Sequence, residues 1–298
     1  MTNLPNSFQE DILANSNHKS WAEVIKDYVG KGMDSKRTWY GSVADAYNRV
    51  RPRYALELIS RVIELTQLPP KSNILEIGCG PGIATVSFAE LGFSLLSLEP
   101  NSEASQLARQ NCAAYPQVEI VNTSFEEWKI TKNEFDAVLA ATSWHWIDPA
   151  VSYFKSFESL KANGYLVLLW NTPPQLDYPN YQIVDRVYQN LAPSIPIYAR
   201  YEDQLTHQNH FQKFSQDILN SGYFKDLSYE SIVNEVQYSL DDYLLLLSTL
   251  SPYIALEETT RNNLFTKLRE VLDQMLHQDN RDYLTLYYIS AFHVAQKV

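Results

Sequence analysis

The stretch Ile74-Leu75-Glu76-Ile77-Gly78-Cys79-Gly80-Pro81-Gly82 determines how the rest of the sequence is interpreted. Apolar residues interrupted by a single carboxylate are typical of the end of a buried strand, and three glycines then fall within five positions. A strand that ends in a glycine-rich turn and leads into a helix lets the backbone approach a nucleotide-like ligand closely. The residues after the turn predict that helix, with an apolar face of Ile83, Val86, Phe88 and Leu91.

A second carboxylate, Glu99, ends the next apolar run, 21 residues after Gly78. A ribose-binding carboxylate is expected there, because a strand end brings it beside the first glycine turn. Two cofactors compete for this pattern. The dinucleotide fingerprint GxGxxG requires Gly or Ala at its sixth position, where this sequence has Ile83. The glycines instead form GxGxG, preceded by Glu76, and an acid near the turn suits a ligand with an ammonium group better than one with phosphates.

The GxGxG turn with its preceding carboxylate resembles motif I of the class I S-adenosylmethionine (SAM) methyltransferases. The downstream elements are similar to that family as well: a helix over 102–111, a strand over 118–121, a strand over 135–140 and a fifth strand that ends near Trp170. The alternation of strands and helices predicts an α/β fold with a doubly wound sheet. The resemblance implies a Rossmann-like, seven-stranded, mostly parallel sheet with helical cap insertions.

The same resemblance implies a cofactor site, position by position. The amino-acid end of SAM is expected at the turn formed by Glu76, Gly78, Cys79, Gly80 and Gly82. The ribose is expected at Glu99 and Pro100, and the adenine between Ser124 and Phe125. The remaining cofactor contacts are expected from Thr142, Tyr47 and Arg51.

The run Trp144-His145-Trp146-Ile147-Asp148 resembles the small-molecule branch of the family, the methyltransferase type 11 or trans-aconitate methyltransferase-like proteins. The segment Ala46–Tyr54 resembles the N-terminal lid of that branch, and Thr249–Tyr253 resembles another of its elements loosely. The resemblance covers the chain from about residue 38 to its end. It implies methyl transfer from SAM to a small organic molecule, to oxygen first and nitrogen second, with S-adenosylhomocysteine as product.

His145 is the candidate catalytic residue, as a base or as a group that positions the substrate. An imidazole titrates in the range that suits proton transfer near neutral pH. The alternative is that His145 packs against its tryptophan neighbours and orients the loop. The substrate pocket is predicted to be walled by Trp144, Trp146, Trp170 and Tyr253, although such aromatics are as often plain core. His207 and His210 are interpreted as exposed residues of a surface helix, and no metal site is predicted.

Composition limits the classes of partner. The net charge of −11 disfavours nucleic acid, because a phosphate backbone rewards basic surfaces. The apolar runs are far shorter than the roughly 20 residues that a membrane span requires, and the N-terminus lacks a secretory signal. The two cysteines, Cys79 and Cys112, are expected to be free thiols in a reducing cytoplasm. A small-molecule acceptor and a monomer or homodimer are expected.

The chain is predicted to contain a polar N-terminal arm or helix over residues 1–36 and one methyltransferase domain over residues 37–298. Helical cap segments are predicted near 175–222 and 240–277, over the mouth of the acceptor pocket. Two other functions remain open. A catalytically silent SAM-binding partner protein would keep the same cofactor residues. An enzyme acting on protein or RNA would show a broad or basic groove in place of a capped pocket.

Overall fold

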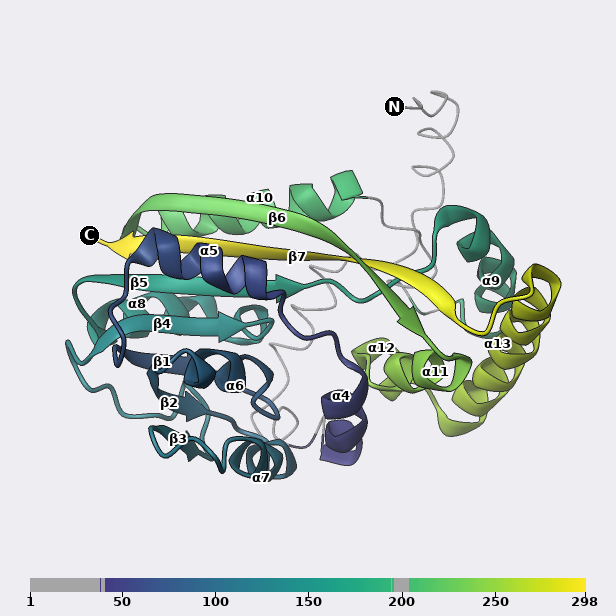
Figure 1. Cartoon of the computed structure of the whole chain (residues 1–298), viewed down its shortest axis with the longest axis horizontal. Helices are drawn as coiled ribbons and strands as arrows, with labels where there is room; N and C mark the ends of the chain where they lie inside the picture. Colours follow the sequence, from purple (N-terminus) through teal and green to yellow (C-terminus); the bar gives the residue numbers. More distant parts are fainter. Residues whose placement is uncertain (1–37, 39–40, 194, 196–203) are drawn as a thin grey trace.

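A computed structural model of the chain describes residue 38 and residues 41–193, 195 and 204–298 (Figure 1). The predicted N-terminal arm lies outside the described residues. Among these, seven strands form one sheet in the order β3-β2-β1-β4-β5-β7-β6. The strands are β1 Asn73–Ile77, β2 Ser94–Leu98, β3 Val118–Val121, β4 Phe135–Ala141, β5 Leu160–Asn171, β6 Phe224–Tyr238 and β7 Leu284–Lys297. Strands β1 to β5 pair in parallel and β7 runs antiparallel to β5 and β6, which confirms the predicted mostly parallel sheet.

Helices cover both faces of this sheet, because alternate residues of each strand point to opposite sides. On one face, Ile74 packs with α5 (Leu56–Thr66) and α6 (Ile83–Glu90). On the other, Leu75 shares a core with α10 (Gln204–Asn220) and with apolar side chains of α8 (Pro149–Ser159). At the β3 edge of the sheet, α7 (Ser102–Asn111) contacts β3. Asp148 caps the N-terminus of α8, because its carboxylate accepts a hydrogen bond from Ala150 N at 2.9 Å.

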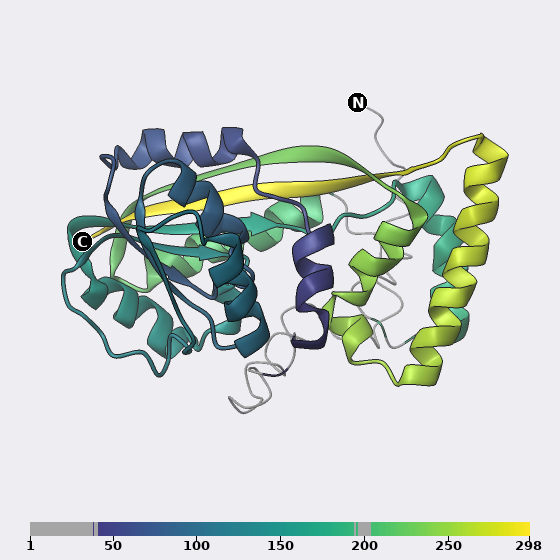
Figure 2. The same cartoon turned by 60° about the horizontal axis from the view of Figure 1, so that its bottom comes forward.

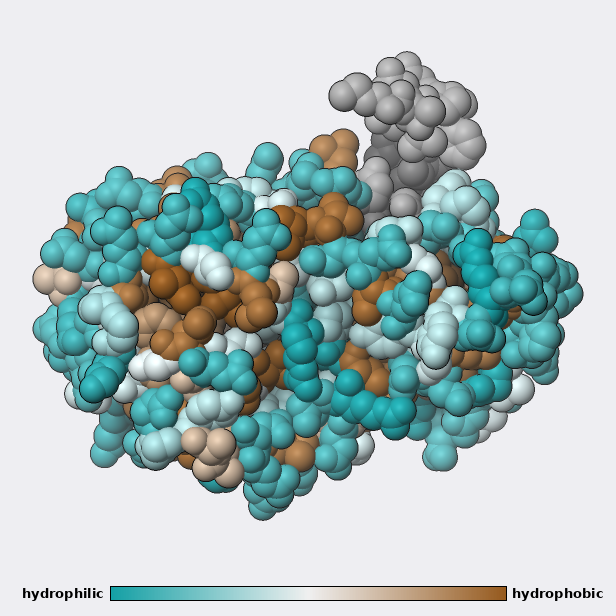
Figure 3. Space-filling view, in the orientation of Figure 1, coloured by the Kyte–Doolittle hydropathy of each residue, from teal (hydrophilic) through white to brown (hydrophobic). Residues whose placement is uncertain are grey.

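Strands β6 and β7 are long, with 15 and 14 residues, and their far ends reach a second group of helices (Figures 1 and 2). We name this group the cap: α9 (Tyr178–Leu191), α11 (Leu240–Ser248), α12 (Ser251–Ile254) and α13 (Glu258–Asp279). The cap has its own hydrophobic core. In α13, buried Leu264, Leu268 and Leu272 recur at helical spacing, while hydrophilic residues cover its outer side (Figure 3).

The predicted cap segment 175–222 divides into two parts with different packing. Helix α9 belongs to the cap core through Val184, Val187 and Tyr188. Helix α10 instead packs against the sheet, where Phe211 and Ile218 join the core beneath β6 and β7. A third piece, α4 (Ala44–Val50), stands between the sheet and the cap (Figure 2). No described helix is long and apolar enough to cross a membrane.

His293, a buried residue of β7, connects β7 with β5 and α10 through hydrogen bonds. Trp170 Nε1, in β5, donates to His293 Nδ1 at 3.0 Å, so the ring proton of His293 lies on Nε2 and is donated to Phe211 O of α10 at 3.0 Å. Burial lowers the pKa of His293 to about 4, so the imidazole is neutral near pH 7. This bond chain fixes Trp170 and α10 relative to each other.

Replacing His293 tests how much this bond chain stabilises the fold. His293→Leu leaves the buried indole N–H of Trp170 without its acceptor, so we expect a loss of roughly 2–4 kcal/mol in the free energy of unfolding by urea. The matched control is His277→Leu, at an exposed site on α13, with an expected change within about 0.5 kcal/mol. Equal unfolding free energies for the two variants would contradict this role.

Candidate functional site

A cavity of about 300 Å³ lies at the carboxyl ends of β1, β2, β4 and β5. The strand order reverses between β1 and β4, and in open α/β sheets ligands bind at this kind of position. Loops of the sheet line one side of the cavity. The other side is lined by α4, by α10 and by residues 250–252 of the cap. One continuous cavity is therefore shared by the sheet, the lid-like α4 and the cap.

The glycine turn after β1 lines the cavity through Gly78, Cys79 and Gly80. Two of its amides, those of Gly78 and Cys79, donate to Leu98 O at 2.8 and 3.0 Å, which ties the turn to the end of β2. Gly78 has φ +66°, and a Cβ there would lie 2.8 Å from Ser143 Cβ. Gly80 has φ +56°, and no described atom lies within 4 Å of its would-be Cβ. Gly78 is thus required by protein packing, and Gly80 leaves space on the cavity side.

Glu99 lies at the end of β2, lines the cavity and is 7% exposed. Its carboxylate accepts hydrogen bonds from Gly80 N and Asn101 N, both at 2.8 Å. Burial raises its pKa to about 7, although the two amides act in the opposite direction. The side chain is therefore held rigidly beside the glycine turn, as a ribose-binding carboxylate needs to be.

Glu76 is fully buried and does not line the cavity. Its Oε2 accepts hydrogen bonds from Thr85 Oγ1 at 2.6 Å and Ser97 Oγ at 2.9 Å, whereas Oε1 has no hydrogen-bond partner. Burial raises the pKa of Glu76 to about 7, and the charge of Glu99 adds to the rise. Direct contact between Glu76 and a cofactor stays a prediction, because in this structure the carboxylate is hydrogen-bonded to side chains of α6 and β2.

The expected adenine loop is held by a buried lysine. Ser124 and Phe125 line the cavity, as does Pro100 at the end of β2. Lys155 Nζ, from α8, donates to the carbonyl oxygens of Phe125 at 2.7 Å and Glu126 at 3.1 Å, and to a third carbonyl in the same loop. Nothing in the local sequence indicated Lys155, since its partners are backbone oxygens about 30 residues away.

Thr142, after β4, lines the cavity with φ +55°, a conformation that is strained for a β-branched residue. Its hydroxyl is hydrogen-bonded to Tyr54 OH at 2.8 Å and accepts from Asn171 N at 3.2 Å. These contacts fix the strained turn between the ends of β4 and β5. Such strain is concentrated at ligand sites in proteins, which supports the expectation for Thr142.

The 3-10 turn Trp144–Trp146 directs its aromatic rings to different places. His145 and Trp146 line the cavity, whereas Trp144 is buried against Tyr153, with ring centroids 5.2 Å apart. The structure does not place Trp144 at the cavity, and its pocket role stays a prediction. The His145 ring stacks on Trp170, which also lines the cavity, at 5.8 Å and 27°. Burial among these rings lowers the pKa of His145 to about 3.

Tyr253 does not line the cavity either, and its pocket role stays a prediction. It is fully buried in the cap core, hydrogen-bonded to Tyr188 OH at 2.6 Å and stacked on Phe265. The preceding residues, Leu250 to Pro252, line the cavity in its place. The short helix α12 explains the difference, because it turns Tyr253 away from the residues before it.

Helix α10 contributes side chains that the sequence interpretation missed. His207 is buried and lines the cavity, so its interpretation as an exposed surface residue is wrong. His210, Phe211 and Phe214 line it as well. Phe214 stacks on Trp170 with centroids 4.4 Å apart. Burial and the positive charge of Lys213 lower the pKa of His210. Among the described residues, no group of three or more His, Cys, Asp or Glu side chains is placed to hold a metal ion.

Tyr47 and Arg51 line the cavity from the side of α4. The Arg51 guanidinium lies 4.6 Å from the centroid of the Tyr47 ring and hydrogen-bonds to Thr249 of the cap. Gly82 does not line the cavity, and a Cβ there would lie 3.3 Å from Cys112 Sγ. Cys79 and Cys112 are both free thiols.

The described side chains fit a nucleoside cofactor with an amino-acid end. Gly80 leaves a cradle that a side chain would fill, and Glu99 presents a buried carboxylate beside it. Ser124 and Phe125 line the same cavity as these residues. A carboxylate at this position suits ribose hydroxyls.

Comparisons with known proteins agree with this geometry. A sequence model described as a methyltransferase domain matches residues 75–168, which run from β1 into β5. An uncharacterized methyltransferase of Mycobacterium tuberculosis is 34% identical over 133 residues, which are 45% of this chain and 52% of that protein. An uncharacterized methyltransferase of Schizosaccharomyces pombe is 21% identical over 266 residues, 88% of this chain and 98% of that one. This chain thus spans about half the length of the mycobacterial relative that it matches.

Solved structures show the same fold. A type II methyltransferase of Anaeromyxobacter dehalogenans superimposes with a TM-score of 0.61 at 20% identity, over 83% of this chain and 97% of that one. A methyltransferase from an antibiotic biosynthesis pathway of Anabaena variabilis superimposes with a TM-score of 0.53 at 17% identity, over 82% of this chain and 98% of that one. At these identities the similarity establishes the fold alone.

The two glycines of the turn should separate packing from ligand binding. Gly80→Ala places a methyl group in the cavity-side space, so we expect at least a roughly tenfold loss of S-adenosylhomocysteine affinity by calorimetry, with a stability cost of about 1–2 kcal/mol from its positive φ. Gly78→Ala adds a clash with Ser143, so its stability cost should be larger, roughly 2–4 kcal/mol. Wild-type affinity in Gly80→Ala would contradict the assignment of the turn.

The buried carboxylate of Glu76 should make stability depend on pH. Its pKa is raised from 4.5 to about 7, so between these values the folded chain holds a proton that the unfolded chain has lost, and stability falls as pH rises. Glu76→Gln keeps an acceptor for Thr85 and Ser97 and removes the titration. We expect the Tm of this variant to exceed that of the wild type by on the order of 5 °C at pH 8, and by much less at pH 5. A pH-independent difference would contradict this account.

Proposed function

We propose that the chain is a class I, SAM-dependent methyltransferase and that it transfers a methyl group from SAM to a small organic molecule. Oxygen is the first choice of acceptor atom and nitrogen the second. The observation that carries the proposal is the single cavity that joins the glycine turn and Glu99 to an aromatic chamber beneath α10 and the cap. Membership of the trans-aconitate-like branch stays a prediction.

The cofactor half of the cavity supplies the holding groups. When bound, SAM supplies a methyl group that its sulfonium makes electrophilic. Glu99 would accept hydrogen bonds from the ribose, and Ser124 with Phe125 would enclose the adenine. The open side of the Gly78–Gly80 turn would receive the amino-acid end. Tyr47 and Arg51 would cover this half from the side of α4.

The acceptor half holds aromatic and imidazole side chains. Trp146, Trp170, Phe211 and Phe214 would orient an organic acceptor and keep water away from it. Positioning of this kind supplies roughly 7–11 kcal/mol, whereas a general base supplies typically 10²–10⁴-fold, or about 3–5 kcal/mol. Positioning is therefore the larger contribution expected from this chain.

His145 fits a positioning role better than that of a base. Burial disfavours its charged form, since the pKa is lowered to about 3. A neutral imidazole of this kind takes up a proton poorly near pH 7, but it can hydrogen-bond to an acceptor hydroxyl. The imidazoles leave the acceptor half suited to a hydroxyl-bearing molecule.

A small acceptor is favoured over a macromolecule by shape and charge. Residues 250–252 of the cap and helix α10 line the cavity, and the chain carries a net charge of −11, which opposes binding to a nucleic acid. A cytoplasmic location and a monomeric or homodimeric state belong to this proposal.

Calorimetry with SAM, S-adenosylhomocysteine and NADH tests the cofactor. We expect micromolar binding of the two adenosyl ligands and no heat with NADH. Glu99→Gln should weaken SAM binding by at least about tenfold, because a charged hydrogen-bond acceptor for the ribose is lost. The matched control is Glu119→Gln, at an exposed acid of β3, which should bind SAM as the wild type does. NADH binding without SAM binding would refute the proposal.

Turnover requires a separate measurement. Transfer of labelled methyl groups from SAM should be screened against phenols, aliphatic alcohols, aromatic amines and carboxylic acids. Transfer to a hydroxyl compound would support the first choice and transfer to an amine the second. SAM binding with no transfer to any class would favour a catalytically silent SAM-binding protein.

A further inference from the structure

We propose that α4 and the cap helix α11 act as one body, so that cofactor binding beneath α4 also fixes the acceptor wall formed by Leu250–Pro252. Arg51 and Tyr238 are the positioning residues that join the two pieces. The proposal rests on the proposed function, because it takes an adenosyl cofactor as the ligand beneath α4.

The C-terminal carbonyl groups of both helices accept hydrogen bonds across the junction, from the last residue of β6 and from the residue that follows α4. Tyr238, at the end of β6, donates its hydroxyl to Val50 O, the last carbonyl of α4. In the other direction, Arg51 Nη2 donates to Thr249 O, the C-cap carbonyl of α11, at 3.0 Å. The carbonyl groups of a helix C-terminus lack partners within the helix. Separating α4 from the cap would therefore remove the partner of a carbonyl in each helix.

Charge strengthens the second of these contacts. A cation is favoured at a helix C-terminus, where the helix dipole is negative. Arg51 Nε also donates to Thr249 Oγ1 at 3.0 Å, so its planar fork holds two oxygens of one residue. A lysine could not reproduce this pair of contacts with the same geometry. The guanidinium group also lies over the Tyr47 ring, so the contacts that hold Arg51 fix this ring as well.

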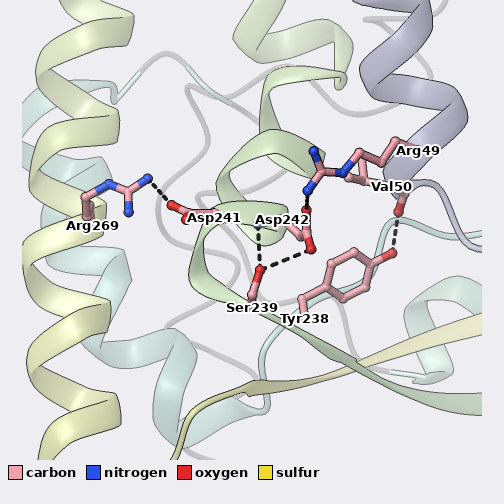
Figure 4. Close-up of polar contacts among 7 residues, drawn as sticks. All are labelled: Arg49, Val50, Tyr238, Ser239, Asp241, Asp242 and Arg269. Carbon is pink, nitrogen blue, oxygen red and sulfur yellow. Dashed lines mark hydrogen bonds and ion pairs between the residues drawn. The ribbon is translucent and has the colours of Figure 1, made fainter.

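A further ion pair lies at the surface of the same junction (Figure 4). Arg49 Nη2 is 2.6 Å from Asp242 Oδ1, while Ser239 caps α11 through Asp242 N. On the far side of α11, Arg269 of α13 pairs with Asp241 at 2.7 Å. Exposed ion pairs contribute little on their own. The partly buried Arg51 fork and the Tyr238 hydroxyl therefore carry the junction, and the Arg269 pair offers a control in the same helix.

The junction connects the two halves of the cavity. Tyr47 and Arg51 line it from α4, and Leu250 follows directly after Thr249, the residue that Arg51 holds. Towards the sheet, the α4 side is held by Asn111 Nδ2, which donates to Asn48 Oδ1 at 3.2 Å, and by Asn171 Nδ2, which donates to Pro52 O. A ligand that fixes Tyr47 and Arg51 against the glycine turn would therefore also fix the cap residues that follow Thr249.

Hydrogen exchange of the full chain, read by mass spectrometry with S-adenosylhomocysteine as the probe, tests this coupling without an acceptor. In the wild type we expect saturating ligand to slow exchange of peptides over residues 240–254 by at least about fivefold. Tyr238→Phe removes only a hydroxyl outside the cavity lining. At saturating ligand it should reduce the slowing to less than about twofold, and Arg51→Lys should do the same. Arg269→Ala should respond as the wild type does.

Calorimetry on each variant, carried out first, sets the saturating concentration and keeps the two proposals distinct. If the wild type does not bind S-adenosylhomocysteine, the proposed function fails and the coupling with it. If the wild type binds and residues 240–254 exchange at an unchanged rate, the coupling alone is refuted. Full slowing in Tyr238→Phe would refute it as well. If Tyr238→Phe does not fold, as judged by circular dichroism, Arg51→Lys decides between the same two results.

Discussion

The burial of two carboxylates at the carboxyl end of the sheet is the constraint on which the cavity depends. A buried carboxylate is costly unless hydrogen bonds compensate it. Glu99 is compensated by the amides of Gly80 and Asn101, and Glu76 by hydroxyls of α6 and β2. These bonds hold the glycine turn, the end of β2 and the start of α6 in one arrangement. These bonds make the cofactor half of the cavity rigid, and α4 and the cap line the other side of the cavity.

Much of the sheet could be predicted from the sequence, because its signals are local. Apolar runs bounded by turn residues locate β1 to β4 to within about one residue, and the glycine turn indicates where a ligand would lie. Which side chains line the cavity depends on how each helix is rotated about its axis. The sequence indicates this rotation less clearly than it indicates the strands. Within the Trp144–Trp146 turn, only His145 and Trp146 reach the cavity, and α12 turns Tyr253 into the cap core while Leu250 to Pro252 face the cavity.

Long-range packing explains what the sequence could not indicate. Lys155 holds the loop after β3 through backbone carbonyls, and carbonyls have no signature in a sequence. His207 and His210 have the spacing of an ordinary surface helix, and their place in the cavity depends on α10 lying against β6 and β7. The Trp170–His293–Phe211 bond chain joins residues from three distant segments. A signal for α10 was available in its apolar residues Phe211, Phe214 and Ile218, which recur at helical spacing.

The antiparallel end of the sheet explains why a cap can be added without disturbing the cofactor half of the cavity. Strands β6 and β7 are neighbours, so they remain paired along their extended ends. Helices α11 to α13 follow β6 and precede β7 in the sequence, and they belong to a separate hydrophobic core. The chemistry at the glycine turn is then independent of the cap sequence, while the acceptor chamber is shaped by Leu250–Pro252 and α10. Because a fold does not determine function, the proposed function places acceptor choice in these cap and α10 positions. In the proposed coupling, the Arg51 and Tyr238 contacts join these positions to the cofactor half of the cavity.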